Sequence, residues 1–281
     1  MALLATLATA ADASFCAQSG WSQIWADEFS GSALNTSAWT VDLNAGDSRV
    51  RDSQGTADNV YLEDGALVLR SQHETVAGSA YNYTSGAVET KDKVSWKHAG
   101  GIRACVRAKL PGGETGHGQG IWPAHWMMPD DTSCWPSHGE IDIMEMINGD
   151  GTTHATYHWR MREIGGCGDK CANGSSTPAC RHQSIGASHP DQHDASQWHE
   201  YAVEYASDHI YFALDGEIFQ RLTADSTTSH GDHAEFFDTP YYMILNTAVG
   251  GPWPGEPTLK TKFPTYHRID YVKIAQPKSE A

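Results

Sequence analysis

The stretch Gly139-Glu-Ile-Asp-Ile-Met-Glu-Met-Ile-Asn-Gly149 decides the fold prediction, because three acidic residues are interspersed with isoleucine and methionine. Alternation of this kind indicates a half-buried strand, in which side chains two residues apart share one face. Glu140 and Asp142 therefore share a face, whereas Glu145 is an odd number of residues from both. Either Glu145 points into the core, or one extra residue around Ile143-Met144 forms a β-bulge that returns Glu145 to the face of the other acids.

Other segments that are expected to form strands come before and after this one in the sequence. Asp64-Gly65 and Asp215-Gly216 each lie between two apolar runs, which is the strongest short-range signal of a hairpin. Residues 102–110 alternate apolar and polar side chains, so one face of that strand is expected to be apolar and the other polar. Many short strands separated by turn signals predict an all-β sandwich or barrel, with Glu140 in a strand away from the sheet edge. Further strands are expected at residues 201–205, 210–214, 241–249 and 268–274.

The overall charge limits the class of partner. The 281 residues contain 19 Lys and Arg against 35 Asp and Glu, for a formal net charge of −16. Long-range repulsion disfavours nucleic acid and anionic membranes, so a neutral partner fits better.

Several features are typical of an exported protein. Residues 1–13 combine an apolar run with small residues, as a secretory signal peptide does, and are too short to span a bilayer; a disordered start is the alternative. Six Cys and three Asn-X-Ser/Thr triplets fit a secreted protein with disulfides, whose pairing stays open. Cys167, Cys171 and Cys180 precede His182, but their spacing does not match that of structural zinc sites. A loop cross-linked by disulfides is therefore favoured over a zinc site.

Three acids on one face of a strand suit glycoside hydrolysis. A retaining glycosidase needs one ionised carboxyl that attacks the anomeric carbon and one protonated carboxyl for the leaving oxygen, about 5–5.5 Å apart. With the bulge, a rise of about 3.3 Å per residue brings the carboxyls of Glu140 and Glu145 to roughly that separation. Crowded negative charge raises the pKa of the last carboxyl to ionise, which provides the proton donor. A solvated acidic face and a calcium site are the alternatives.

Tryptophans accompany the acids in the sequence. Trp122, Trp126 and Trp135 lie shortly upstream, and Trp253 lies in a Gly/Pro-rich segment that cannot be regular sheet. Indole faces cover the apolar faces of pyranose rings, although a buried core position is the alternative for each tryptophan. The pattern favours a sugar-binding cleft.

On these residues the sequence resembles glycoside hydrolase family 16, the laminarinase-like β-glucanases. The family signature E-[IL]-D-x-x-E is present as Glu140-Ile-Asp142-Ile-Met-Glu145, in the form that carries the bulge. Similar segments follow in order from Trp25-Ala-Asp-Glu-Phe29 through Trp122-Pro-Ala-His-Trp-Met127 to Asp270-Tyr-Val-Lys-Ile274. The resemblance implies a single catalytic domain over residues 21–275, folded as a β-jelly-roll sandwich of two antiparallel sheets with a concave substrate cleft.

The resemblance also implies roles for individual residues. Glu140 would be the nucleophile, Glu145 the acid/base and Asp142 the assisting carboxylate. No cofactor is implied for catalysis, but some members bind a structural calcium ion through residues that match Glu28, the Gly65 carbonyl and Asp270. Substrate-binding positions match Asn59, Trp122, Trp126, Trp135, His158 and Trp253.

The function expected from this resemblance is that of a secreted, monomeric, endo-acting retaining hydrolase that cleaves laminarin-type β-1,3-glucan or mixed β-1,3/1,4-glucan. A non-catalytic β-glucan-binding protein and a β-glucan transglycosylase on the same fold are the alternatives. Relatives that cleave sulfated polysaccharides are disfavoured by the net charge, unless a local basic patch overrides it. The chain departs from the family at Ala87, where many members carry arginine, and in an insertion at residues 165–193 with no assigned function.

Overall fold

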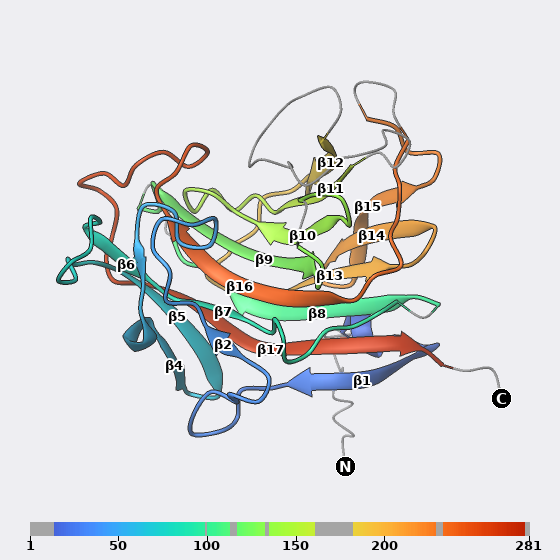
Figure 1. The fold of residues 1–281 in the computed structure, drawn as a ribbon, viewed down its shortest axis with the longest axis horizontal. Helices are drawn as coiled ribbons and strands as arrows, with labels where there is room; N and C mark the ends of the chain where they lie inside the picture. The colour runs from blue at the N-terminus through green and yellow to red at the C-terminus, as the bar shows by residue number, and fades with distance from the viewer. Residues whose placement is uncertain are drawn as a thin grey trace, which may run out of the picture.

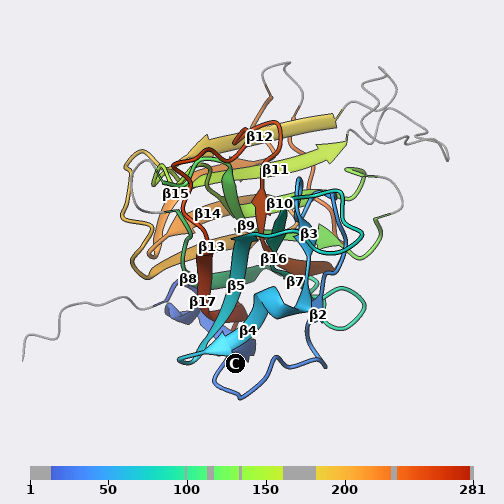
Figure 2. The ribbon, with the colours of Figure 1, turned by 90° about the vertical axis from the view of Figure 1, so that its left-hand side faces the viewer.

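The structure is a computed structural model that describes residues 14–98, 100–112, 117–132, 135–160, 182–228 and 233–278. Within these residues it contains 17 strands and two short 3-10 helices, η1 (Phe15–Ala17) and η2 (Ala57–Asn59). The strands form two sheets that lie face to face (Figures 1 and 2). The prediction of an all-β sandwich is confirmed.

The ten-stranded sheet is antiparallel apart from the short parallel pair β3–β6. Its strands lie in the order β15 (Glu217–Thr223), β14 (His209–Leu214), β13 (His199–Tyr205), β8 (Ile102–Lys109), β17 (Thr265–Pro277), β5 (Ala66–His73), β6 (Tyr83–Ser85) and β3 (Gln54–Gly55), with β1 (Trp21–Asp27) paired to β17 and β4 (Val60–Glu63) paired to β5.

The seven-stranded sheet is antiparallel throughout. Its order is β12 (His182–Ser188), β11 (His154–Arg160), β10 (Glu140–Glu145), β9 (Ile121–Pro129), β16 (Tyr241–Val249), β7 (Ala87–Glu89) and β2 (Thr40–Val41). Strand β10, which carries the three acids, therefore has a partner on each side, as the sequence predicts.

Both Asp-Gly hairpins form where the sequence places them. Asp64 and Gly65 connect β4 to β5 with φ of 52° and 75°, and Asp215 and Gly216 connect β14 to β15 with φ of 48° and 82°. Two consecutive residues with positive φ give the turn a twist that matches the strands it joins, and Gly adopts this conformation without steric cost.

The core lies between the two sheets and is rich in aromatic residues. Tyr157 and Trp159 of β11 are buried and stack with ring centroids 5.4 Å apart. Tyr201 and Phe212 of the ten-stranded sheet are also fully buried in the same cluster. Because alternate residues of a strand point to opposite faces, burial of Tyr157 and Trp159 turns His154, Thr156 and His158 to the other face of the seven-stranded sheet.

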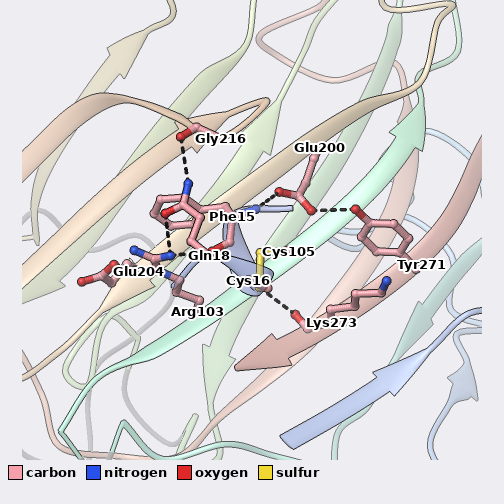
Figure 3. Close-up of a disulfide and its surroundings, with 10 residues drawn as sticks. All are labelled: Phe15, Cys16, Gln18, Arg103, Cys105, Glu200, Glu204, Gly216, Tyr271 and Lys273. Carbon is pink, nitrogen blue, oxygen red and sulfur yellow. Dashed lines mark hydrogen bonds and ion pairs between the residues drawn. A yellow bond between two sulfur atoms is a disulfide. The ribbon is translucent and has the colours of Figure 1, made fainter. Parts of the chain in front are cut away.

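The polar face of β8 is covered by the N-terminal segment (Figure 3). Arg103 lies between the rings of Phe15 and Trp21, 3.7 Å and 4.2 Å from their centroids, and donates to Glu204 at 2.8 Å. Cys16 of η1 forms a disulfide with Cys105 of β8. The polar face predicted from the alternation is present; its Arg103 and Cys105 are buried under a segment distant in sequence, whereas Arg107 and Lys109 stay partly exposed.

Two predictions concern residues that the structure does not describe. The signal peptide at residues 1–13 lies outside the described residues, as do Cys134, Cys167, Cys171 and Cys180. Across the described part of the chain, no helix has the length and apolar character needed to cross a membrane.

Candidate active site

A bulge in β10 gathers the three acids on one face. On the β11 side Glu140 pairs with His158 and Asp142 with Thr156, and the register then shifts before Glu145, which pairs with His154. The shift on the β9 side lies between Asp142 and Met144. The bulge inferred from the odd spacing of Glu145 is therefore confirmed. Ile141, Ile143 and Met144 point into the core and are at most 1% exposed, so burial on the opposite face holds the acids in place.

The acids lie in a cleft of about 840 Å³ on the face of the seven-stranded sheet that is turned away from the ten-stranded sheet. The cleft is lined by side chains of β9, β10, β11 and β16 and of the loops beside them. Its volume is within the usual range for small-molecule and sugar sites. Glu140 and Asp142 line the cleft. Six other residues that were predicted to belong to the site line it as well: Trp122, Trp126, Trp135, Glu145, His158 and Trp253.

Two indole groups donate hydrogen bonds to the two glutamates. Trp122 Nε1 donates to Glu145 Oε1 at 3.0 Å, and Trp135 Nε1 donates to Glu140 Oε2. The third cleft indole, Trp126, instead donates to Asn246 Oδ1 at 2.7 Å. Each glutamate thus has its own tryptophan donor, which the motif spacing did not indicate.

The tryptophans differ in the surface that they offer to a sugar ring. Trp135 and Trp253 are each 41% exposed, as a stacking platform requires. The Trp122 ring contacts the Arg51 guanidinium, 5.1 Å from the ring centroid, and the edge of Trp253 at 5.3 Å. Trp122 thus combines these ring contacts with the hydrogen bond to Glu145, and it stays partly exposed in the cleft.

Comparison with known proteins agrees with this geometry. The family model "Glycosyl hydrolases family 16" matches residues 48–273. The chain belongs to this family.

Relatives within family 16 are similar over most of the chain. "Glucan endo-1,3-beta-glucosidase A1" of Niallia circulans is 32% identical over 282 residues, which cover 91% of this chain but 38% of that protein. "Beta-glucanase" of Rhodothermus marinus is 29% identical, with 90% of this chain and 85% of that protein covered. The laminarinase catalytic domain of Thermotoga maritima superimposes with a TM-score of 0.73 at 29% identity, covering 92% of this chain and 99% of that one.

Burial raises the pKa of all three acids of this family 16 chain, and negative charge nearby raises it further for the two glutamates. Burial, and then the negative charge of Asp142, raise the pKa of both Glu140 and Glu145 to about 8. Burial raises the pKa of Asp142 to about 7. The three carboxyls titrate as one coupled group. Between about pH 7 and 8 this group carries one negative charge and keeps two protons.

Hydrogen bonds decide where that single charge resides. Glu140 and Asp142 are hydrogen-bonded to each other, so they can share one proton. Each glutamate accepts one neutral indole N–H, Glu140 from Trp135 and Glu145 from Trp122, so these bonds do not distinguish the two; the hydrogen bond with Asp142 belongs to Glu140. We therefore place the negative charge on the Glu140–Asp142 pair and the second proton on Glu145.

A second histidine supports the predicted His158. His158 Nε2 lies 3.0 Å from Asp142 Oδ2, and His158 Nδ1 lies 2.7 Å from Nε2 of His182, the first residue of β12. Burial, and then the charge of His158, lower the pKa of His182 to about 4, so this imidazole is neutral at pH 7. His182 also packs on Trp135 with ring centroids 4.6 Å apart. The insertion at residues 165–193 thus contributes a strand and a side chain to the site.

Asn59 does not belong to the site, which corrects the prediction that it contacts sugar. It is fully buried in η2, where its Nδ2 donates to Thr84 Oγ1 at 2.8 Å and its Oδ1 accepts from Arg70 Nε at 2.9 Å. It is absent from the residues that line the cleft. Its amide joins η2 to β5 and β6, and the residue has no exposed surface.

Of the residues predicted to bind calcium, Asp270 lies in β17, Glu28 directly follows β1, and Gly65 directly precedes β5. Asp27 of β1 pairs with Val272 of β17, and Ile269 of β17 pairs with Leu67 of β5. Glu28, Gly65 and Asp270 are each within two residues of these pairs, so the three lie at neighbouring positions in the sheet. Both carboxylates are ion-paired, however: Asp270 with Arg107 at 2.6 Å and Glu28 with Lys273 at 3.2 Å.

Among the described residues, one cluster of three His, Cys, Asp or Glu side chains is close enough to hold a metal ion. It consists of Glu140, Asp142 and His158, whose ligand atoms lie within 4.8 Å of one another. Hydrogen bonds to Trp135, and between Asp142 and His158, already engage these atoms. The donor set therefore fits acid–base chemistry better than metal binding.

Several cleft residues were not found from the sequence. They are Ser48, Arg49, Arg51, Lys91, Tyr242 and Asn246, together with His182 beside the cleft. No motif marks them, because they come from separate segments that meet only when β16, β7 and β12 join the sheet.

Proposed function

We propose that this chain is an endo-acting retaining glycoside hydrolase that cleaves β-1,3-glucan by double displacement, with mixed β-1,3/1,4-glucan as a second substrate. The observation that carries the proposal is the bulged strand β10, which presents Glu140, Asp142 and Glu145 together in the cleft. The relatives named for endo-1,3-β-glucan and β-glucan cleavage support the linkage and the endo mode. Because the chain spans 38% of the Niallia relative, the proposal concerns the segment that matches.

The first step forms a glycosyl–enzyme bond. A Glu140 carboxylate oxygen attacks the anomeric carbon while the bond to the leaving oxygen breaks, and Glu145 gives its proton to that oxygen. As the charge of Glu140 is consumed in the new bond, the proton of the Glu140–Asp142 pair stays on Asp142. His158 can then orient Asp142 through the 3.0 Å contact.

The second step restores the enzyme. Glu145, now ionised, takes a proton from water, and the resulting hydroxide oxygen attacks the anomeric carbon from the face that the leaving group vacated. The bond to Glu140 breaks and its carboxylate is regenerated. Two inversions give net retention of configuration. A sugar hydroxyl in place of water would give transglycosylation.

The first experiment replaces the proposed nucleophile. Glu140→Ala should abolish hydrolysis of laminarin, and azide should rescue cleavage of an activated β-glucoside to give a glycosyl azide of inverted configuration. Glu217→Gln, an exposed acid in β15 outside the cleft, is the matched control and should keep normal activity. Wild-type activity in Glu140→Ala would refute the assignment. Product profiles on laminarin, lichenan, agarose and carrageenan then define the linkage, and longer products would reveal transglycosylation.

Two finer points extend the proposal. The Cys16–Cys105 disulfide supports export, because disulfides persist in oxidising compartments.

The nearness of Glu28, Gly65 and Asp270 supports a structural calcium site, provided that Arg107 and Lys273 release the carboxylates. A rise in Tm on adding calcium, lost in Asp270→Asn, would support that site; an unchanged Tm would refute it.

A further inference from the structure

Three cationic side chains line the side of the cleft formed by β16 and the loops next to it: Arg49, Arg51 and Lys91. Arg49 Cζ lies 5.9 Å from the Trp126 ring centroid, and Lys91 Nζ lies 5.8 Å from that of Tyr242. Arg51 forms an isolated bridge with Val249 at the end of β16. In a chain with net charge −16, this basic wall opposes the overall charge.

The three cations differ in how their charge is compensated. Arg49 is ion-paired with Glu89 at 2.7 Å and with both Asp42 and Asp47 at 3.4 Å. Across the described ranges, neither Arg51 nor Lys91 is ion-paired with any carboxylate. Arg49 is therefore neutralised within the protein, whereas Arg51 and Lys91 keep their charge for another partner.

Among the three cations, Arg51 most clearly lacks hydrogen-bond partners. Its Nε atom is buried and has no hydrogen-bond partner in the described part of the chain. Its Cζ lies 5.1 Å from the Trp122 ring centroid, and no hydrogen bond joins the guanidinium N–H groups to an acceptor among the described residues. Buried polar groups normally have partners, since leaving a donor unpaired destabilises the structure. Nε itself is covered by protein, but Arg51 lines the cleft, so the terminal N–H groups of its guanidinium are the ones that an acceptor there would engage.

We propose that Arg51, assisted by Lys91, binds an anionic substituent on the polysaccharide chain, either a carboxylate or a sulfate ester. Hydroxyl groups of a neutral glucan can accept hydrogen bonds but do not balance the charge. Two anionic oxygens match the planar fork of a guanidinium and form a bidentate, charge-assisted pair. The inference rests on the proposed hydrolytic function and refines its substrate class: the expectation from net charge alone is replaced by the local charge of the cleft.

The test compares substrates that differ only in charge. The kcat/KM values of the full chain are measured on laminarin oligosaccharides that are neutral, carboxymethylated or sulfated, with wild type, Arg51→Gln and Lys91→Gln. Arg51→Gln should lower the ratio of anionic to neutral kcat/KM by about 10- to 100-fold, the effect of removing one hydrogen bond to a charged group. Lys91→Gln should lower it by up to about fivefold, as for a partly exposed ion pair. The control Lys97→Gln, an exposed ion-paired lysine that is not among the cleft-lining residues, should leave the ratio unchanged.

The two anionic substrates distinguish carboxylate from sulfate ester as the preferred group. Added NaCl should weaken cleavage of the anionic substrates more than that of the neutral one. If Arg51→Gln lowers kcat/KM equally on all substrates, Arg51 acts only through Trp122 and the proposal is overturned.

A chain without hydrolytic activity would cleave none of these substrates, and the anion site is then tested by binding alone. Calorimetry measures the binding of the same oligosaccharides to wild type and to Arg51→Gln. Preferential binding of the anionic oligosaccharides that is lost in Arg51→Gln would support the site, and equal binding would overturn it.

Discussion

Replacing Trp135 with Phe should move the acidic limb of the pH–rate profile to higher pH. The substitution keeps a flat ring beside the sugar but removes the N–H that donates to Glu140. A hydrogen bond to a charged group contributes about 1.5–3 kcal/mol, and about 1.4 kcal/mol corresponds to one pKa unit, so the pKa of Glu140 should rise by about 1–2 units. The nucleophile must be ionised, so kcat/KM near pH 6 should fall by about 10- to 100-fold.

Trp122→Phe provides the complementary change. It removes the 3.0 Å hydrogen bond to Glu145, which raises the pKa of the proton donor. Because this carboxyl acts in its protonated form, the basic limb should move to higher pH, whereas the acidic limb should remain in place. The two variants therefore shift opposite limbs of the profile.

Trp126→Phe is the matched control, because its N–H donates to Asn246 and not to a carboxyl. The assay is kcat/KM on laminarin between pH 4 and 10 for wild type and the three variants. Wild type should be most active between about pH 7 and 8, where the three acids carry one charge. The reasoning fails if Trp135→Phe moves the acidic limb no further than Trp126→Phe does.

Three further predictions concern parts of the structure beyond the indoles. His182→Ala should lower kcat/KM by about 2- to 10-fold through loss of one hydrogen bond to His158, and His182→Gln, which can replace that bond, should restore it; equal losses in both would contradict this. His267 pairs with His125 at 2.9 Å in the core, and burial lowers its pKa to about 3, so the stability it contributes is complete above pH 6.5 and is lost as pH falls. Urea unfolding should therefore show wild type losing about 2 kcal/mol or more between pH 7 and 5 relative to the variant with both histidines changed to Leu; parallel losses would disprove this. Cys16→Ser with Cys105→Ser should reduce the free energy of unfolding by about 2–4 kcal/mol and leave kcat/KM on laminarin unchanged, since the disulfide lies on the sheet opposite the cleft; a lowered kcat/KM would show coupling to the site.

Local patterns in the sequence predicted the central features of the site. The odd spacing of Glu145 left two alternatives, a position in the core or a bulge, and the structure has the bulge. The Asp-Gly pairs at 64–65 and 215–216 located two hairpins, since few other residues adopt positive φ twice in succession. The tryptophans at 122, 126, 135 and 253 were correctly placed in the cleft, although their hydrogen bonds were not foreseen.

Asn59 shows where transfer by resemblance failed. A position that matches a family motif can serve packing instead, and here the side-chain amide bonds to Thr84 and Arg70 within the fold. The sequence contains no sign of this, because both partners are distant in the chain and their approach depends on the pairing of β4 with β5 and of β5 with β6.

The sequence by itself located several strands and two turns, and it limited Glu145 to two positions, in the core or beside the other acids, because side-chain alternation and turn chemistry act over a few residues. Only the tertiary structure decided which cysteines pair, which indole binds which carboxyl, and that Arg51 and Lys91 reach the cleft without a counter-charge. These features arise from the order of strands across two sheets, which brings together segments separated by many residues of chain. Sheet order depends on the free energy of the whole core, and no local pattern encodes it.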